Sequence, residues 1–339
     1  MSELEFRDAI RQAIAEEMKR DDTVVLWGED VAAAGGVFKA TPGLLETFGA
    51  ARVMDTPISE LALAGGAFGA AVTGLRPVIE IMFGDFMALP MDSVINQAAK
   101  TWYLSNGRQR APIVVRSAVG AGGRFGAIHS QNPATWLWNV PGLKIVGPAF
   151  PHDARDLLAA AIRDDNPVVF LEHKRLYSIK HRAPTWPRAN IGQAQIVREG
   201  EDLTVVTWLK GVHDALAAAE QLAAHEISVE VIDVRSLRPL DLETIIASVS
   251  RTNRLLLVEE GPALGGWARG VLGAIAEHAL ESLDDAWVLA TAEHPIPYSP
   301  PLEDAFLPGA ERIASVVLDR AGVAVASSPG TVVERGGVR

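Results

Sequence analysis

Short apolar, β-branched segments alternate with helical patterns along most of this chain, and this alternation limits its fold more than any other feature. Helices are expected at 60–74, 87–105 and 152–163, and strands at 23–27, 77–81, 113–116, 144–146 and 168–172. Such alternation predicts an α/β fold whose mostly parallel sheet carries helices on both faces. An earlier helix places Phe6, Ile10, Ile14 and Met18 on one face, and Ser2 with Glu5 predicts a capping box in front of it.

The pattern stops once and then begins again, which predicts two α/β domains. Residues 180–192, KHRAPTWPRANIG, contain two prolines and no hydrophobic period. We therefore expect a first domain at 1–186, a linker at 187–192 and a second domain at 193–325. In the second domain, strands are expected at 203–208, 229–234 and 254–259, and helices at 212–224, 241–249 and 265–280. The final stretch, 326–339, is expected to be a flexible tail.

Composition excludes several classes of function. The chain has 339 residues, a formal net charge of −11 and no cysteine. An acidic chain without a dense Lys/Arg run is not expected to bind nucleic acid or an anionic membrane. The lack of cysteine removes disulfides and thiolate chemistry and suits a cytoplasmic protein. The N-terminus does not have the pattern of a signal peptide, and the run from Leu61 to Leu75 is too short and glycine-rich to span a bilayer.

Glu60 stands at the head of an uncharged, small-residue run, DTPISELALAGGAFGAAVTGL at 55–75, which is expected to be a buried helix. Two interpretations are open. Ser59 could cap the helix while Glu60 complements the positive end of its dipole. Alternatively, an acid at the mouth of an apolar layer is poorly solvated, which raises its proton affinity and suits proton exchange.

A glycine-rich loop, SAVGAGGRFGAIHSQ at 117–131, follows the third expected strand. Its glycines miss the G-x-G-x-x-G spacing, because Phe125 stands where the last glycine belongs, so a dinucleotide site is not expected. The loop instead delivers His129, either as a catalytic residue or as an ordinary loop histidine.

Two further segments each allow a structural and a functional interpretation. Phe83 and Phe86 follow a strand end, where an aromatic side chain belongs to the core or stacks on a ligand ring. Asp164, Asp165 and Asn166 form a polar turn before Pro167, or offer oxygen ligands to a cation. The sequence contains no H-E-x-x-H, G-x-S-x-G, Walker lysine loop or Gly-Asp-Gly metal–diphosphate motif.

Taken together, these segments resemble the β subunit of the thiamine-diphosphate-dependent first component of 2-oxoacid dehydrogenase complexes. The similarity extends from about residue 4 to residue 320. Its motifs occur in order as GED (28–30), DTPISE (55–60), GLRPVIE (74–80), DSVINQAAK (92–100), HSQ (129–131), VPGLKIV (140–146), IRDDNPV (162–168) and PIPYSPPLED (295–304). The resemblance implies a pyrimidine-binding domain followed by a transketolase C-terminal-like domain.

The resemblance also implies a role for each matching residue. Glu60 would hydrogen-bond the aminopyrimidine ring of thiamine diphosphate and favour its imino tautomer, and Phe86 would lie against that ring. His129 would face the reacting carbon and assist reductive acylation of the lipoyl group. A potassium ion would be held by Ile113, Ala161, Ile162, Asp164 and Asn166, largely through main-chain oxygens.

The absent Gly-Asp-Gly motif implies that this chain holds half of a cofactor site. In the resembled family an α subunit binds the diphosphate and Mg²⁺, within an α₂β₂ assembly that docks on a dihydrolipoyl acyltransferase core and serves its lipoyl domain. The implied activity is oxidative decarboxylation of a small 2-oxo acid with a lipoyl disulfide as acceptor. The substrate stays open between pyruvate, branched-chain 2-oxo acids and acetoin. The segment EHKRLYSIK (172–180) is similar to segments of the acetoin and branched-chain members.

Three other classes of function are weighed against this one. Transketolase- and deoxyxylulose-type transferases carry both cofactor halves on one chain, and this chain lacks the diphosphate half. A nicotinamide dehydrogenase is disfavoured by the broken glycine spacing. A non-catalytic β-like docking or structural subunit would be favoured by loss of Glu60, Phe86 or His129, and all three are present.

Overall fold

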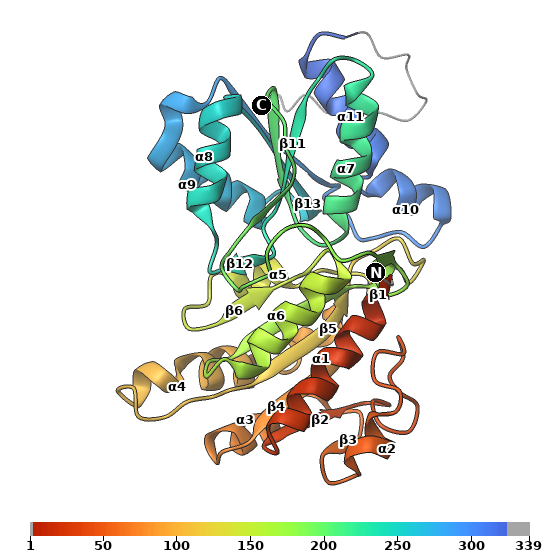
Figure 1. Ribbon diagram of the computed structural model, residues 1–339, viewed down its shortest axis with the longest axis vertical. Helices are drawn as coiled ribbons and strands as arrows, with labels where there is room; N and C mark the ends of the chain where they lie inside the picture. The colour runs from red at the N-terminus through yellow and green to blue at the C-terminus, as the bar shows by residue number, and fades with distance from the viewer. Residues whose placement is uncertain (1–2, 324–339) are drawn as a thin grey trace.

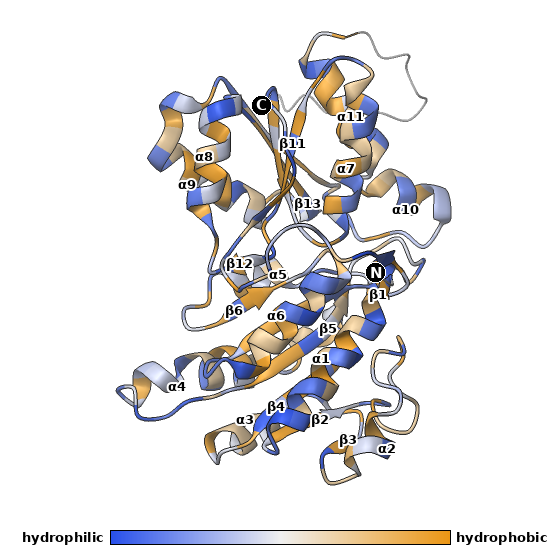
Figure 2. Cartoon of the chain, viewed as in Figure 1, coloured by the Kyte–Doolittle hydropathy of each residue, from blue (hydrophilic) through white to orange (hydrophobic). Residues whose placement is uncertain are grey.

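Two sheets, one above the other in Figure 1, organise the chain, and each carries helices on both faces. The computed structural model describes residues 3–323. Figure 2 shows that the strands are largely hydrophobic, whereas the helices alternate hydrophobic and hydrophilic residues. This is the difference expected between a sheet buried on both faces and helices with one solvent-facing side. The predicted α/β class with mostly parallel sheets is confirmed.

The first sheet has seven strands in the order β12-β6-β7-β5-β4-β2-β3. Its strands are β2 (Val24–Gly28), β3 (Val53–Asp55), β4 (Arg76–Phe83), β5 (Val114–Val119), β6 (Lys144–Val146), β7 (Val168–His173) and β12 (Ser236–Arg238). All neighbours are parallel except β12, which runs antiparallel to β6. β12 comes from the sequence range expected to form the second domain, so that range also completes the edge of the first sheet.

Two helices, α1 (Phe6–Arg20) and α6 (Pro151–Arg163), pack together against one face of this sheet. Phe6, Ile10, Ile14 and Met18 are fully buried there, as their spacing predicts. The predicted capping box is not found. Glu5 is itself the N-cap and its side chain makes no capping bond, and Ser2 lies outside the described residues. The Glu5 carboxylate instead pairs with Arg7 at 2.8 Å.

The opposite face is covered by α3 (Glu60–Val72) and by the segment after β4. The sequence predicts one helix at 87–105, but this segment divides into a 3₁₀ turn η1 (Gly84–Ala88), a π-helix η2 (Asp92–Ala98) and a short α4 (Ala99–Leu104). Pro90 lies between the first two and cannot donate a helical hydrogen bond, which interrupts the bonding pattern although Leu89 before it keeps helical dihedrals.

Within this chain only one side of α3 is buried, whereas the sequence analysis expects a buried helix. Its core side is made of Glu60, Leu63, Ala64, Ala67 and Ala71. The exposed α3 face consists of Leu61, Ala62, Gly65, Gly66 and Gly69, without one charged side chain. A Cβ added at Gly66 or Gly69 would meet nothing within 4 Å. The packing of this chain therefore does not require glycine at either position.

The second sheet has five strands in the order β14-β13-β10-β11-β9. Its strands are β9 (Gln195–Arg198), β10 (Leu203–Thr207), β11 (Val229–Asp233), β13 (Arg254–Pro262) and β14 (Asp285–Thr291). β9 is antiparallel to β11 and the other neighbours are parallel. The helices α7 (Lys210–Ala223) and α11 (Ala310–Arg320) cover one face, and α8 (Leu242–Thr252) and α9 (Trp267–Ala279) the other (Figure 1).

Short elements complete the described chain. They are β1 (Leu4–Glu5), α2 (Leu44–Phe48), α5 (Ala134–Trp138), η3 (Lys174–Leu176), β8 (Lys180–His181), η4 (Leu280–Ser282) and α10 (Pro300–Phe306). The predicted flexible tail at 326–339 lies outside the described residues. No helix between residues 3 and 323 is both long and apolar enough to cross a membrane.

A buried ion-pair network holds the register of the central strands. Arg116 on β5 bonds Glu172 on β7 through two contacts of 2.7 and 2.8 Å and Glu80 on β4 at 2.8 Å. All three side chains are buried, and burial raises the pKa of Glu80. A strand shifted by one residue would leave a buried charge without its partner, which costs several kcal/mol, about 3–5 when one member is removed. The network therefore favours a single alignment of the strands whose carboxyl ends carry the site.

Candidate active site

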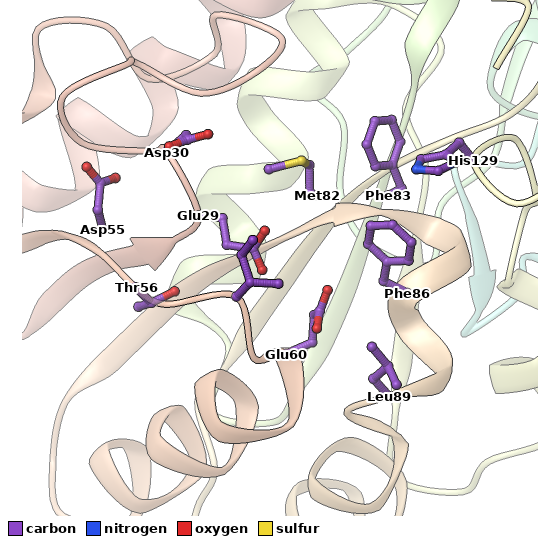
Figure 3. A pocket seen from close by; sticks show the side chains of 11 residues that line it. Glu29, Asp30, Asp55, Thr56, Glu60, Met82, Phe83, Phe86, Leu89 and His129 are labelled. Atoms are coloured by element: carbon purple, nitrogen blue, oxygen red, sulfur yellow. The ribbon is translucent and has the colours of Figure 1, made fainter.

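The carboxyl ends of β2, β3 and β4 meet at a pocket of about 570 Å³ (Figure 3). Clefts at the carboxyl ends of parallel strands are the usual ligand sites of α/β folds, because the loops there diverge. The lining side chains come from the strand ends, the start of α3, η1 and the glycine-rich loop; they are Glu29, Asp30, Asp55, Thr56, Ile58, Glu60, Met82, Phe83, Phe86, Leu89 and His129. Glu60, Phe86 and His129, which are far apart in sequence, therefore line one pocket.

Glu60 is the first residue of α3 and is only 6% exposed. Its carboxylate points into the space between Thr56 and Phe86 (Figure 3). Ser59 is the N-cap, but its hydroxyl makes no capping hydrogen bond, so the structure does not support the interpretation in which Ser59 caps the helix through its side chain. The negative charge of Glu60 can still interact favourably with the positive end of the helix dipole. Its burial in a ligand-sized pocket is what the proton-exchange interpretation requires.

Four carboxylates give the pocket a strongly negative character. Glu29, Asp30, Asp55 and Glu60 all line it. Burial raises the pKa of Glu29, and the nearby Glu60 and Asp30 carboxylates raise it further. Asp55 also has a structural role, since it accepts the main-chain amides of Ala32 at 2.7 Å and Ala33 at 3.2 Å. Within residues 3–323, no lysine or arginine lines this pocket.

Three rings form its aromatic wall. Phe83 and Phe86 are edge-to-face with centroids 5.7 Å apart. The His129 ring lies edge-to-face to both, with centroids 4.8 Å from Phe83 and 5.3 Å from Phe86. Rings of this geometry restrain one another and present a flat apolar surface to the cavity. Phe86 is thus part of the pocket wall as well as the core.

The backbone at His129 is held by two contacts that the sequence analysis does not identify. Lys174 donates to the carbonyl oxygen of His129, and Asp85 accepts the side-chain amide of Gln131 at 2.8 Å. Burial lowers the pKa of Lys174 to about 8, although nearby carboxylates oppose this. Glu29, Asp85 and Lys174 are the neighbours that were missed. The quoted motifs GED and EHKRLYSIK contain two of them, but neither motif alone indicates contact with His129 or Glu60.

The five residues of the expected potassium site lie together at the opposite, amino edge of the first sheet, around the turn between α6 and β7. The Arg76 guanidinium donates to the carbonyl oxygens of Ile162 at 3.1 Å and Asp164 at 3.0 Å. The Ile113 and Ala161 oxygens accept the amides of Val168 and Asp164. The Asp164 carboxylate pairs with Lys144 and accepts the side-chain amide of Asn166 at 3.1 Å. Oxygen donors converge here, but two cationic side chains already engage them.

Side chains that commonly bind metals are not clustered elsewhere. Within the described part of the chain, no three His, Asp or Glu side chains form a group that could hold a metal ion.

Comparison with known proteins assigns this fold to the transketolase type of architecture. The family model described as "Transketolase, pyrimidine binding domain" matches residues 2–180, and "Transketolase, C-terminal domain" matches residues 192–313. A solved structure titled "Split gene transketolase, inactive beta4 tetramer" superposes with a TM-score of 0.78 at 20% identity. It covers 95% of this chain and 99% of that one. At this identity the likeness shows the fold.

Curated relatives define the family more closely. The 2-oxoisovalerate dehydrogenase subunit beta of Bacillus subtilis is 45% identical over 95% of this chain and 99% of its own length. The pyruvate dehydrogenase E1 component subunit beta of Rhizobium meliloti is 43% identical over 94% and 70%. The acetoin:2,6-dichlorophenolindophenol oxidoreductase subunit beta of Bacillus subtilis is 43% identical over 94% and 97%. The chain belongs to the β subunits of the thiamine-diphosphate-dependent 2-oxoacid and acetoin dehydrogenases, a family of oxidoreductases.

Proposed function

We propose that this chain supplies the aminopyrimidine half of a thiamine diphosphate site in a 2-oxoacid dehydrogenase, and that an α subunit supplies the diphosphate half. One observation carries the proposal: buried Glu60 faces an aromatic wall in a pocket lined by four carboxylates and, among the described residues, by no cation. Such a pocket suits a flat ring that can share a proton and repels a diphosphate. The diphosphate and its Mg²⁺ are therefore assigned to the partner.

The residues of the pocket fit the aminopyrimidine ring. The Phe86 face provides an apolar surface for it, and the Glu60 carboxylate would accept or share a proton at a ring nitrogen. Glu29, whose pKa is raised by burial and by the nearby Glu60, lies in the same pocket. When bound, thiamine diphosphate supplies the nucleophilic carbon and the electron sink for decarboxylation of a 2-oxo acid.

His129 has a separate role in the proposal. Its ring packs beside Phe83 and Phe86 and lines the same pocket, on the side away from Asp55 (Figure 3). An imidazole can donate or accept a proton near neutral pH. We assign it proton delivery during transfer of the acyl group to a lipoyl disulfide.

Exposed apolar side chains at the mouth of the pocket favour contact with a second chain. Ile58, Leu61 and Leu89 are 84%, 56% and 56% exposed there. Ile58 and Leu89 line the pocket and Leu61 begins the uncharged exposed α3 face. Exposed apolar side chains gathered at a site favour protein contact. We propose an α subunit over this surface, in an α₂β₂ assembly that serves a dihydrolipoyl acyltransferase core and its lipoyl domain.

The substrate is a small 2-oxo acid, pyruvate or a branched-chain 2-oxo acid, with acetoin as the alternative. The similarities of 45%, 43% and 43% are too close to rank the three. The cytoplasmic location suggested by composition stays a prediction, as do the domain boundaries at 1–186 and 193–325.

The test is activity with and without the α subunit. We expect the isolated chain to be inactive, and the co-expressed α–β complex to reduce a dye acceptor in the presence of thiamine diphosphate, Mg²⁺ and one of the three substrates. Each substrate is assayed separately, with enzyme lacking thiamine diphosphate as the control. Turnover by the isolated chain would contradict the split site, and a well-assembled complex inactive on all three substrates would contradict the activity.

Potassium at the α6–β7 turn stays a prediction as well. Main-chain oxygens suit a monovalent cation, but Arg76 would have to release the carbonyls of Ile162 and Asp164. If potassium binds the folded state, the melting temperature of the α–β complex is expected to be higher in KCl than in NaCl at equal ionic strength. Equal melting temperatures would mean that Arg76 already provides the positive charge at this turn.

A further inference from the structure

The glycine-rich loop that carries His129 is anchored by carboxylates from the second sheet domain. The anchors come from β13 and from α10, the helix that lies on the side of that domain facing the first (Figure 1). Helix α10 contains the end of the PIPYSPPLED segment at 295–304, a sequence motif that the proposed chemistry does not use. The contacts between this motif and the loop give it a function.

Glu303 on α10 is the first anchor. Its side chain is fully buried, and its carboxylate accepts the amide of Gly122 at 2.9 Å and that of Arg124 at 3.2 Å. The Arg124 guanidinium also donates to it at 2.7 Å. Hydrogen bonds from a guanidinium or a main-chain amide to a buried carboxylate are stronger than neutral ones. A single charged group therefore fixes three donors of one short loop segment.

Glu260 on β13 is the second anchor. Its carboxylate accepts the amide of Ala121 at 2.5 Å and lies 2.9 Å from Nε2 of His173. Because Nδ1 of His173 accepts the Arg175 amide, Nε2 carries the proton and donates to Glu260. Burial acts to raise the pKa of Glu260, but His173 and the Ala121 amide outweigh it and hold the pKa below its usual value. The anchor is thus ionised at neutral pH.

Two glycines of the loop allow neighbouring rings to approach its backbone closely. A Cβ on Gly120 would lie 2.1 Å from the His173 ring, and one on Gly126 would lie 2.2 Å from the Tyr298 ring. Both glycines have positive φ, at 89° and 72°. The glycines of this loop do not match the dinucleotide motif. Their positions are explained by the side chains that pack against the loop.

The anchored segment leads directly to the catalytic histidine. His129 follows Gly126 by three residues, and its own carbonyl is bound by Lys174. The side chain of Lys174 is also within 5.3 Å of the Phe83 ring and 5.2 Å of the Phe125 ring. The loop is thus held at Ala121–Arg124 by the second domain and at His129 by the first, and Arg175 of the first domain also donates to the carbonyl oxygen of Gly122.

We propose that Glu303 and Glu260 are positioning residues that hold the glycine-rich loop so that His129 faces the cofactor pocket, which makes the C-terminal domain a working part of the active site. The expected loss of lipoyl acylation rests on the proposed function of His129, whereas the expected loosening of the loop does not. The two can therefore be tested separately.

The mechanical test compares Glu303→Gln with Asp304→Asn in the α–β complex. Asp304 binds the same guanidinium at 2.8 Å but is 62% exposed, so its loss is expected to have little effect. In Glu303→Gln, the amides of Gly122 and Arg124 are expected to exchange hydrogen at least about tenfold faster, and trypsin is expected to cleave after Arg124. Unchanged exchange and cleavage would overturn the proposal. Should this variant fail to fold, Glu260→Gln tests the same loop through Ala121.

The catalytic test measures two reactions of the same complexes. Displacement of His129 is expected to reduce kcat for acylation of a lipoyl domain about 10- to 100-fold in Glu303→Gln, while KM for the 2-oxo acid and dye reduction change little. In a His129→Ala background, Glu303→Gln should add no further loss, because both changes remove one function. Additive losses would overturn positioning through His129. A mobile loop with normal acylation in both Glu303→Gln and His129→Ala would refute the proposed role of His129 while leaving the mechanical anchor intact.

Discussion

Glu60→Gln is expected to lower turnover of the assembled enzyme by about 10²- to 10⁴-fold, the range in which a positioned proton-transfer group contributes. Glutamine keeps the size of the side chain and a hydrogen-bonding end, but it cannot share a proton with a ring nitrogen of the cofactor. The side chain is only 6% exposed, so water does not readily replace it. Both dye reduction and lipoyl acylation are expected to fall, because the change acts before the two reactions diverge.

A matched control separates this role from the helix dipole. Glu243 is also an acid in the first turn of a helix, α8, but it is exposed and lies outside the pocket. If Glu60 served only the dipole, Glu60→Gln and Glu243→Gln would each lose about 0.3–1 kcal/mol of stability and keep normal rates. We expect only Glu243→Gln to behave in this way. Native mass spectrometry should find the α–β assembly intact in both variants.

Gly69→Leu is expected to weaken the association of this chain with the α subunit about tenfold or more without unfolding the chain. A Cβ at Gly69 meets nothing within 4 Å inside the chain, so leucine fits the isolated subunit. It also removes the helix penalty of glycine, about 1 kcal/mol, and should raise the melting temperature slightly. At a closely packed interface, however, inserted methylenes cost about 1–3 kcal/mol. Reduced assembly together with a more stable subunit would identify the exposed α3 face as an interface.

Gly273→Leu in α9 is the matched control. Gly273 is also an exposed helix glycine whose added Cβ would meet nothing within 4 Å, but Arg269 and Glu277 stand one turn away on either side. Charged neighbours at these positions are typical of a solvent-facing side. We expect this variant to gain helix stability and to assemble normally in sedimentation velocity. Normal assembly of Gly69→Leu as well would exclude the exposed α3 face from the interface.

Local pattern was sufficient for most of the regular fold. The strands at β2, β4 to β7, β10, β11 and β13 were predictable because each is a short apolar run buried on both faces. The break at Pro90 was missed because the periodicity of DSVINQAAK continues through a π-helix. Strand β12 was missed because three residues carry no pattern of their own, and only pairing with β6 makes them a strand.

The site was partly predictable for the same reason. Glu60 is noticeable because a lone acid leads an uncharged run, and the motif order of the family assigns roles to Phe86 and His129. Glu29, Lys174 and Glu303 could not be assigned, because each is an ordinary charge in its local sequence. Each of them lies beside residues distant in the chain, as Glu303 lies beside Gly122, 181 positions away.

The sequence by itself determined the class of fold, the family and the main residues of the pocket, since hydrophobic period and ordered motifs are local properties that one chain displays without its partners. Only the tertiary structure decided which side of α3 is exposed, what the loop glycines accommodate and which carboxylates bind the loop that carries His129. These depend on burial and on contacts between distant segments. A charge in water and a charge buried against an amide have the same letter in the sequence but very different free energies.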